Sequence, residues 1–89
     1  MHKAEAKIIN RLGLHARAAA KLTQLAGGYR AEIWLSRSGR RVNAKSIMGV
    51  MMLAAGLGST VELETDGPDE QEALDALEQL FLQRFGEAE

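Results

Sequence analysis

Segments with the two-residue hydrophobic period of a strand alternate along the chain with segments that have the period of a helix. The order of these segments limits the possible folds more than any other feature. Four short segments alternate apolar with polar side chains, which is typical of strands with one buried face. In the first, Ala4, Ala6 and Ile8 share one face, and a tight turn at Ser38-Gly39 joins the second to the third. The strands are predicted at residues 4–9, 31–36, 40–43 and 59–65.

Three other segments have the period of a helix. The first covers residues 16–26, and Gly27-Gly28 ends it, as glycine commonly does after a helix. The second follows Ser46, which stands where an N-cap belongs, and closes before Gly56. The third follows a turn at 66–69, and its apolar residues lie at 73, 74, 77, 80, 81 and 85. In the first of these helices one face can be shared by Ala16, Ala19, Ala20, Leu22 and either Leu25 or Ala26. In the second, the residues expected to face the core are Ile47, Val50 and Leu53.

The resulting order, βαββαβα, predicts an α+β fold. Four strands with one apolar face each need one cover, and three amphipathic helices can provide it. We therefore expect an open-faced β-sandwich, a four-stranded antiparallel sheet covered on one face by three helices. The 89 residues have room for one hydrophobic core, so we expect a single domain over 1–89.

Composition excludes several kinds of site. The chain has no cysteine, so disulfides, thiolate chemistry and cysteine-ligated zinc are ruled out. Its two histidines, His2 and His15, are far apart, and we expect no metal and no cofactor. No run reaches the roughly 18 apolar residues of a membrane span, and the first 17 residues lack the apolar core of a secretory signal. We expect a cytoplasmic protein without membrane insertion, acting as a small carrier, binding module or regulatory domain.

Charge is unevenly distributed along the sequence. Residues 1–65 carry ten basic and four acidic side chains, whereas residues 66–89 carry one basic and eight acidic ones. The basic part suggests an anionic ligand or partner, although solvated faces that only keep the protein soluble would give the same pattern.

The segment Gly13-Leu14-His15-Ala16-Arg17 has the pattern of a phosphate-accepting site. A glycine turn leads into a helix that starts at His15 or just after it, and helix N-termini favour anions because their N–H groups are unpaired. A neutral imidazole is available as a nucleophile near pH 7, and Arg17 has donors that match phosphoryl oxygens. A phosphohistidine intermediate fits these residues, as does a histidine that only caps a helix. Serine-histidine-acid catalysis fits poorly, because no nucleophile-elbow motif occurs and no acid is evident beside His15.

A second segment, residues 43–53, holds Ser46 and three of the four methionines. If Met48 and Met51 are exposed, they would form an adaptable contact surface. The alternative is a methionine-rich core in which Ser46 is simply an N-cap.

Both segments resemble the signatures of a known family. GLHARAAAKL and NAKSIMGVMML, with 31 residues from His15 to Ser46, are similar to those of the histidine-containing phosphocarrier family, HPr, of the bacterial phosphoenolpyruvate-dependent phosphotransferase system. The resemblance covers essentially the whole chain and implies the same sheet and three helices. It implies that His15 accepts phosphate on Nδ1 from phospho-enzyme I and passes it to a IIA protein or domain, and that Arg17 steadies that phosphate. It also implies that Ser46 is the residue available to a serine kinase/phosphorylase.

On this interpretation the protein is a monomer and a substrate of enzyme I more than an enzyme in itself. Basic side chains (Lys21, Lys45 and Arg40) would surround its docking face and steer an acidic partner groove toward it. The face itself would combine His15 and Arg17 with Ala16, Ala20, Ile47, Met48 and Met51.

One departure from the family pattern is visible. The first motif usually reads HARPA, and here Ala18 replaces the proline. Alanine is also well tolerated in a first helical turn, so we expect a slightly looser helix start without loss of chemistry. A branch of the family that serves regulation only lacks the histidine, and the presence of His15 argues against it.

Other functions remain open from the sequence. The nitrogen-related regulatory branch uses similar carriers, although Ser46 within AKSIMG favours the sugar-type form. An RNA-binding α+β module could use the basic first part, but Trp34 is a lone aromatic on its strand, and we expect no nucleic-acid partner. An acyl-type carrier would want Asp-Ser where this chain has Lys45-Ser46.

Overall fold

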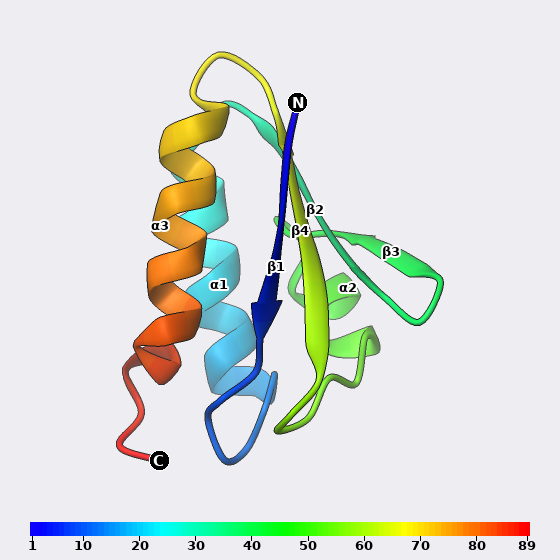
Figure 1. Ribbon diagram of the computed structural model, residues 1–89, viewed down its shortest axis with the longest axis vertical. Coiled ribbons are helices and arrows are strands. Elements are labelled where there is room, and N and C mark those ends of the chain that lie inside the picture. Colours follow the sequence, from blue (N-terminus) through cyan, green and yellow to red (C-terminus); the bar gives the residue numbers. More distant parts are fainter.

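The chain folds into a four-stranded antiparallel sheet with three helices on one face (Figure 1). A computed structural model describes all residues, 1–89. Along the sheet the strands follow the order β1-β4-β2-β3. The elements are β1 (His2–Lys7), α1 (Ala16–Gly27), β2 (Glu32–Arg37), β3 (Arg40–Asn43), α2 (Ile47–Met52), β4 (Thr60–Asp66), α3 (Glu70–Leu82) and a 3₁₀ turn, η1 (Arg84–Gly86). The predicted α+β class and the order of its elements are confirmed.

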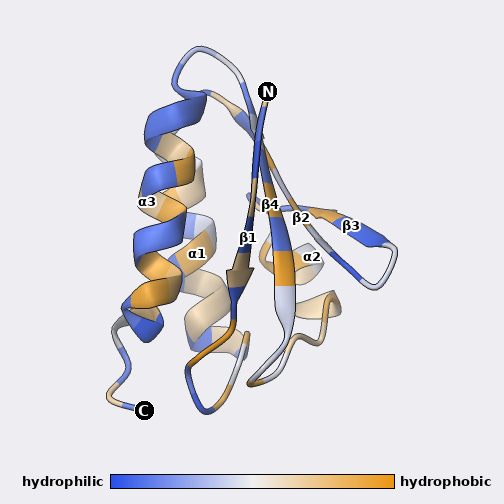
Figure 2. Ribbon diagram, in the orientation of Figure 1, coloured by the Kyte–Doolittle hydropathy of each residue, from blue (hydrophilic) through white to orange (hydrophobic).

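The core lies between the sheet and the helices α1 and α3. Figure 2 shows the apolar residues of α3 turned toward the strands and its polar residues turned away. The shorter α2 contacts α1 and β3. None of the helices is both long and apolar enough to span a membrane. Five strand residues predicted from the alternation to face inward are buried, namely Ala6, Ile33, Leu35, Val61 and Leu63. Ala4 is only half-buried, and Glu64 and Thr65 of β4 are buried as well.

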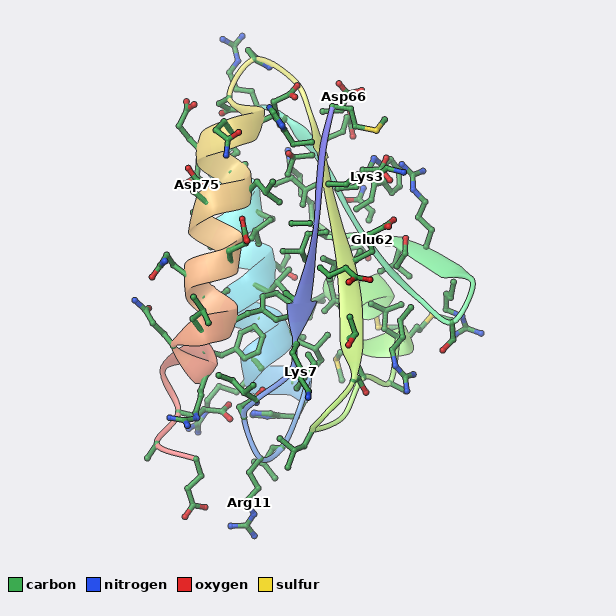
Figure 3. The ribbon with its side chains drawn as sticks, viewed as in Figure 1. Lys3, Lys7, Arg11, Glu62, Asp66 and Asp75 are labelled. Atoms are coloured by element: carbon green, nitrogen blue, oxygen red, sulfur yellow. The ribbon has the colours of Figure 1, made fainter.

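The opposite face of the sheet is polar. Lys3 and Glu62 lie on the side of the strands away from α1 and α3 (Figure 3). The guanidinium of Arg41 lies 4.1 Å from the centroid of the Trp34 ring and donates to the buried carboxylate of Glu64 at 2.6 Å. Because the lone aromatic of the sheet is covered in this way, the sheet has no platform on which bases could stack, and this argues against the RNA-binding alternative.

Some boundaries differ from the expected ones. β1 covers His2–Lys7, whereas the alternation predicted residues 4–9. It starts earlier because its first residues pair with the end of β4, although their polarity does not alternate. In the first turn of α1, Ala18 is buried, whereas Ala16, which was expected on the shared face, is exposed. Ile47, the first residue of α2, is 40% exposed, so the expectation that it faces the core is wrong.

Helix α2 also ends earlier than predicted. It stops at Met52 and does not continue toward Gly56, because Ala54 adopts a left-handed conformation with φ of 50°. The backbone of the following residues is then free to bond elsewhere, and the carbonyl of Ala55 accepts from the N–H of Leu14 at 2.9 Å. The early end of α2 thus provides a contact for the turn that precedes His15.

The C-terminal segment, residues 83–89, folds back toward the start of α1. The expectation that position 85 continues the apolar face of the last helix is wrong, because Arg84 and Phe85 are both left-handed, with φ of 55° and 54°. The Phe85 ring is nevertheless buried, 4.9 Å from the Phe81 ring between centroids. The N–H of Arg11 donates to the carbonyl of Glu89 at 2.9 Å, so the C-terminus lies beside the turn between β1 and α1 (Figure 1).

Candidate functional site

His15 is the N-cap residue of α1. Its backbone is extended, with φ of −72° and ψ of 177°, and its carbonyl accepts from the N–H of Ala19 at 2.8 Å. The side chain makes no capping hydrogen bond, which removes the interpretation of His15 as a side-chain cap. The N–H groups of residues 16, 17 and 18 have no acceptor. The imidazole therefore stands beside the unpaired, partly positive start of a twelve-residue helix.

The turn before His15 is held rigidly. Gly13 has a φ of 68°, and a Cβ at this position would lie 2.5 Å from the carbonyl oxygen of Ala55. Only glycine combines this conformation with this close approach. The side-chain amide of the buried Asn10 closes the turn by donating to the carbonyl of Gly13 at 2.8 Å. The start of α1 is thus fixed against the loop that follows α2.

An acid that the sequence did not reveal lies against the ring. The carboxylate of Glu87 contacts Nε2 of His15 through Oε2, and its Oε1 accepts from Nδ2 of Asn10 at 3.0 Å. The expectation that no acid stands beside His15 is therefore wrong. The hydrogen bond from Asn10 holds the pKa of Glu87 below its usual 4.5; the contact with His15 and the charge of Arg17 act in the same direction, while burial opposes them.

A surface hollow of about 740 Å³ opens beside the ring. The side chain of Arg17 lines it, is exposed, and forms no hydrogen bond or ion pair with the rest of the chain. Nδ1 of His15 also has no partner, and nowhere do three or more acidic or histidine side chains gather in a way that could hold a metal ion. A nucleophilic nitrogen, a guanidinium and a helix start thus converge where an anion would bind. The lining residues are Arg11, Leu12, His15, Ala16, Arg17, Glu87, Ala88 and Glu89.

The second predicted segment forms α2 and its cap. Ser46 is the N-cap residue, as predicted, and its Oγ accepts from the N–H of Gly49 at 3.2 Å. Met48 is 71% and Met51 42% exposed, so these two methionines are surface residues and the core interpretation is wrong for them. Ala16 is exposed and Ala20 half-buried on α1, which contacts α2.

The basic side chains expected around this surface are bonded to backbone carbonyls. Lys21 Nζ donates to Phe85 and Lys45 Nζ to Tyr29, each at 2.8 Å, and Arg40 Nη1 donates to Met52 at 3.0 Å. Their positive charges are retained, but their positions are fixed by the fold.

The sequence matches the family model described as "PTS HPr component phosphorylation site" over residues 2–83. The chain belongs to the HPr family of phosphocarrier proteins. It is 68% identical to the HPr of Cupriavidus necator, with all of both chains covered. Among solved structures, it is similar to an HPr from Thermoanaerobacter tengcongensis, with a TM-score of 0.96, 43% identity and full coverage of both chains.

Family membership confirms the resemblance found in the two signature segments. It makes the chain a phosphohistidine carrier of the phosphotransferase system. A crystal structure of an HPr dimer from the same Thermoanaerobacter species is also similar, with a TM-score of 0.79 and 44% identity over 98% of this chain and 100% of that one. Structures in this family thus include dimers, and the monomeric state expected for this chain stays a prediction.

Proposed function

We propose that this chain takes a phosphoryl group from phospho-enzyme I onto Nδ1 of His15 and delivers it to IIA proteins or domains. The observation that carries the proposal is the position of His15 at the unpaired start of α1, with Nδ1 free beside the hollow. The protein acts in the cytoplasm as a monomer, and as a substrate of enzyme I more than an enzyme in itself. Its role is in sugar uptake and the regulation of that uptake.

The chemistry follows from the groups around the ring. The lone pair of Nδ1 attacks the phosphorus, the bond from phosphorus to the donor breaks, and its electron pair stays with the donor. The N–H groups of residues 16, 17 and 18 supply donors for the phosphoryl oxygens at the helix start. Arg17, which has no other partner, adds a charged donor.

The docking face is the surface around His15 and Arg17 together with Ala16, Ala20, Ile47, Met48 and Met51. Exposed methionines adapt to more than one partner, and enzyme I and a IIA protein must both fit the same face. The fixed charges of Lys21 and Lys45 would attract an acidic groove on either partner.

A reconstituted transfer tests the proposal directly. The chain is incubated with phosphoenolpyruvate and enzyme I, and it should acquire one phosphate that is labile in acid and stable in base. Addition of a IIA protein should then remove that phosphate and place it on IIA. The proposal fails if no phosphate is acquired or if it is found on a residue other than His15.

Met48→Asp should weaken binding to both enzyme I and IIA about tenfold to a hundredfold. Burying one large apolar side chain at an interface contributes about 1.5–3 kcal/mol, and each 1.4 kcal/mol is about tenfold in Kd. The melting temperature should hardly change, because Met48 is 71% exposed in the free protein. Titration calorimetry gives the affinities, and Leu82→Asp, at an equally exposed position of α3, is the matched control. A collapse of the melting temperature would show that Met48 belongs to the core.

Ser46 combines a cap with a site for regulation by a serine kinase/phosphorylase. Ser46→Ala should destabilise the protein by about 0.5–2 kcal/mol, because the bond to the N–H of Gly49 is lost. Ser46→Asp should keep the fold, since aspartate caps a helix as well as serine does. It should nevertheless slow phosphate arrival from enzyme I about tenfold or more, because a negative charge beside Met48 repels an acidic groove.

The rate of arrival is measured by quenched flow at low and high salt. The difference in this rate between Ser46→Asp and the parent should be largest at low salt, where the electrostatic repulsion is least screened. Equal rates at low salt would leave Ser46 with a capping role only. A regulatory Ser46 within AKSIMG supports the sugar-uptake branch over the nitrogen-related branch.

A further inference from the structure

We propose that Glu87 is a positioning residue that fixes the tautomer of His15, keeping the proton on Nε2 and the lone pair on Nδ1. The inference rests on the proposed function, because it explains which nitrogen is available to accept the phosphoryl group. It is carried by three observations, namely the contact of the carboxylate with Nε2, the orientation of Asn10, and the anchoring of the C-terminal segment.

The contact with the ring determines where the proton lies. An ionised carboxylate can only accept hydrogen bonds, so the nitrogen that faces it must carry hydrogen. That nitrogen is Nε2, which contacts Oε2 of Glu87. In the neutral ring Nδ1 then has no hydrogen and presents its lone pair, and it has no hydrogen-bond partner in the chain. The reactive nitrogen is thus selected by the group bound to the other one.

Asn10 fixes the carboxylate in turn. Its Nδ2 donates to two acceptors, the carbonyl of Gly13 at 2.8 Å and Oε1 of Glu87 at 3.0 Å. Turning the Asn10 amide over would place its oxygen against two other oxygens, so the orientation is determined by its neighbours. Asn10 is 0% exposed, so water does not compete for its side-chain amide. Oε1 of Glu87 is therefore occupied by Asn10, and Oε2 is the oxygen left for His15.

The C-terminal segment is held strongly enough to act as a support. The Phe85 ring is 1% exposed, and the carbonyl of Phe85 accepts from Lys21 Nζ at 2.8 Å. On the other side of Glu87, the carbonyl of Glu89 accepts from the N–H of Arg11. Arg11 lies in the turn at the same end of the molecule as the C-terminus (Figure 3). Glu87 is thus tied down both before and after its position in the chain.

This arrangement removes any need to move a proton during the reaction. When Nδ1 forms its bond to phosphorus, the bond to the donor breaks and the donor keeps the electron pair. The ring then has phosphorus on Nδ1 and hydrogen on Nε2, and so carries a positive charge beside the Glu87 carboxylate. When the phosphoryl group leaves for an acceptor, the electron pair of the N–P bond returns to Nδ1. The proton stays on Nε2 through both steps.

Glu87→Gln tests the proposal with an inverted tautomer as the expected result. The fixed nitrogen of Asn10 still needs an acceptor, so the new amide turns its oxygen to Asn10 and its NH₂ to Nε2 of His15. Nε2 must then accept, and the proton moves to Nδ1. In ¹⁵N NMR of histidine-labelled protein at about pH 9, where an ordinary imidazole is neutral, the parent should show hydrogen on Nε2 and the variant hydrogen on Nδ1.

Inversion of the tautomer in Glu87→Gln should also slow phosphoryl transfer to His15. In serine proteases, the equivalent carboxylate-to-amide change inverts the histidine tautomer and costs about 10⁴-fold in kcat. The ring of this protein is 27% exposed and can exchange protons with water, so we expect a loss of at least about tenfold in phosphate uptake from enzyme I. The matched control is Glu62→Gln, which makes the same change on β4, on the side of the sheet away from α1 and α3 (Figure 3). It should keep the parent tautomer and rate.

The outcomes separate this proposal from the proposed function. A parent protein that takes up no phosphate contradicts the carrier function, whereas the NMR measurement of the tautomer does not depend on any transfer. If Glu87→Gln retains either the parent tautomer or the parent rate of uptake, the positioning role of Glu87 is overturned. Inversion of the tautomer with slowed uptake, both absent in Glu62→Gln, supports it.

Discussion

His15→Ala should take up no phosphate from phosphoenolpyruvate and enzyme I, while the fold remains intact. The other residues that line the hollow are arginine, leucine, alanine and glutamate, none of which is a comparable nucleophile. The His15 side chain makes no capping bond, so α1 does not depend on it. The contact with Glu87 is lost, and hydrogen bonds that involve a charged group contribute about 1.5–3 kcal/mol, which sets the upper limit of the destabilisation.

The matched control is His2→Ala, which removes the only other histidine of the chain. His2 lies at the other end of β1, where its Nε2 is 3.2 Å from a carboxylate oxygen of Glu70. This variant should acquire phosphate at the parent rate. Radiolabel that remained on His15→Ala but was lost from His2→Ala would refute the assignment of the phosphate to His15.

Phe85→Ala should destabilise the protein by about 3–5 kcal/mol, the usual cost of replacing a buried phenylalanine by alanine. For a domain of 60–100 residues each kcal/mol lowers Tm by about 4–8 °C, so a fall of roughly 12 °C or more is expected. The ring is 1% exposed and packs against Phe81, and no neighbouring side chain replaces it. Leu82→Ala is the control, because Leu82 is 65% exposed and its removal should change stability by less than about 0.5 kcal/mol.

Phe85→Ala should also affect the active nitrogen indirectly. Without the ring, the C-terminal segment loses its main apolar anchor, and Glu87 spends less time against His15. Uptake of phosphate should therefore slow at temperatures where the variant is still folded. If denaturant unfolding shows that Phe85→Ala is as stable as the parent, the C-terminal segment contributes nothing to the core. The proposal that this segment supports Glu87 would then be wrong.

Local patterns were sufficient to predict most of the architecture. The two-residue alternation in 31–36 and 59–65 identified the buried faces of β2 and β4, because each strand has one face toward the helices. Gly13 and Ser46 were enough to predict where α1 and α2 start, because a left-handed turn and an N-cap are short-range features of the backbone. His15 and Arg17 could be proposed together for the same reason, since they are two residues apart.

Long-range contacts had no signature of this kind. Glu87 reaches His15 across 72 positions of sequence, and it does so only because Arg84 and Phe85 adopt left-handed conformations that residues with side chains seldom take. Ala54, which ends α2 early, has the same unusual conformation. The start of β1 was missed for a different reason. It is an edge strand whose first residues are exposed, so no hydrophobic period marks them.

The position of β4 in the sheet bears on how the chain is made. β4 lies between β1 and β2, yet it is the last strand to leave the ribosome, and its partner residues in β1 are among the first. Until residue 66 has emerged, β1 has no strand to pair with, and β2 has only β3. Such non-local pairing slows folding, because the intervening chain must close a long loop before any hydrogen bond is gained. The nascent chain therefore carries an unpaired edge and an uncovered core until β4 has emerged, and α3 can cover the completed sheet only after that.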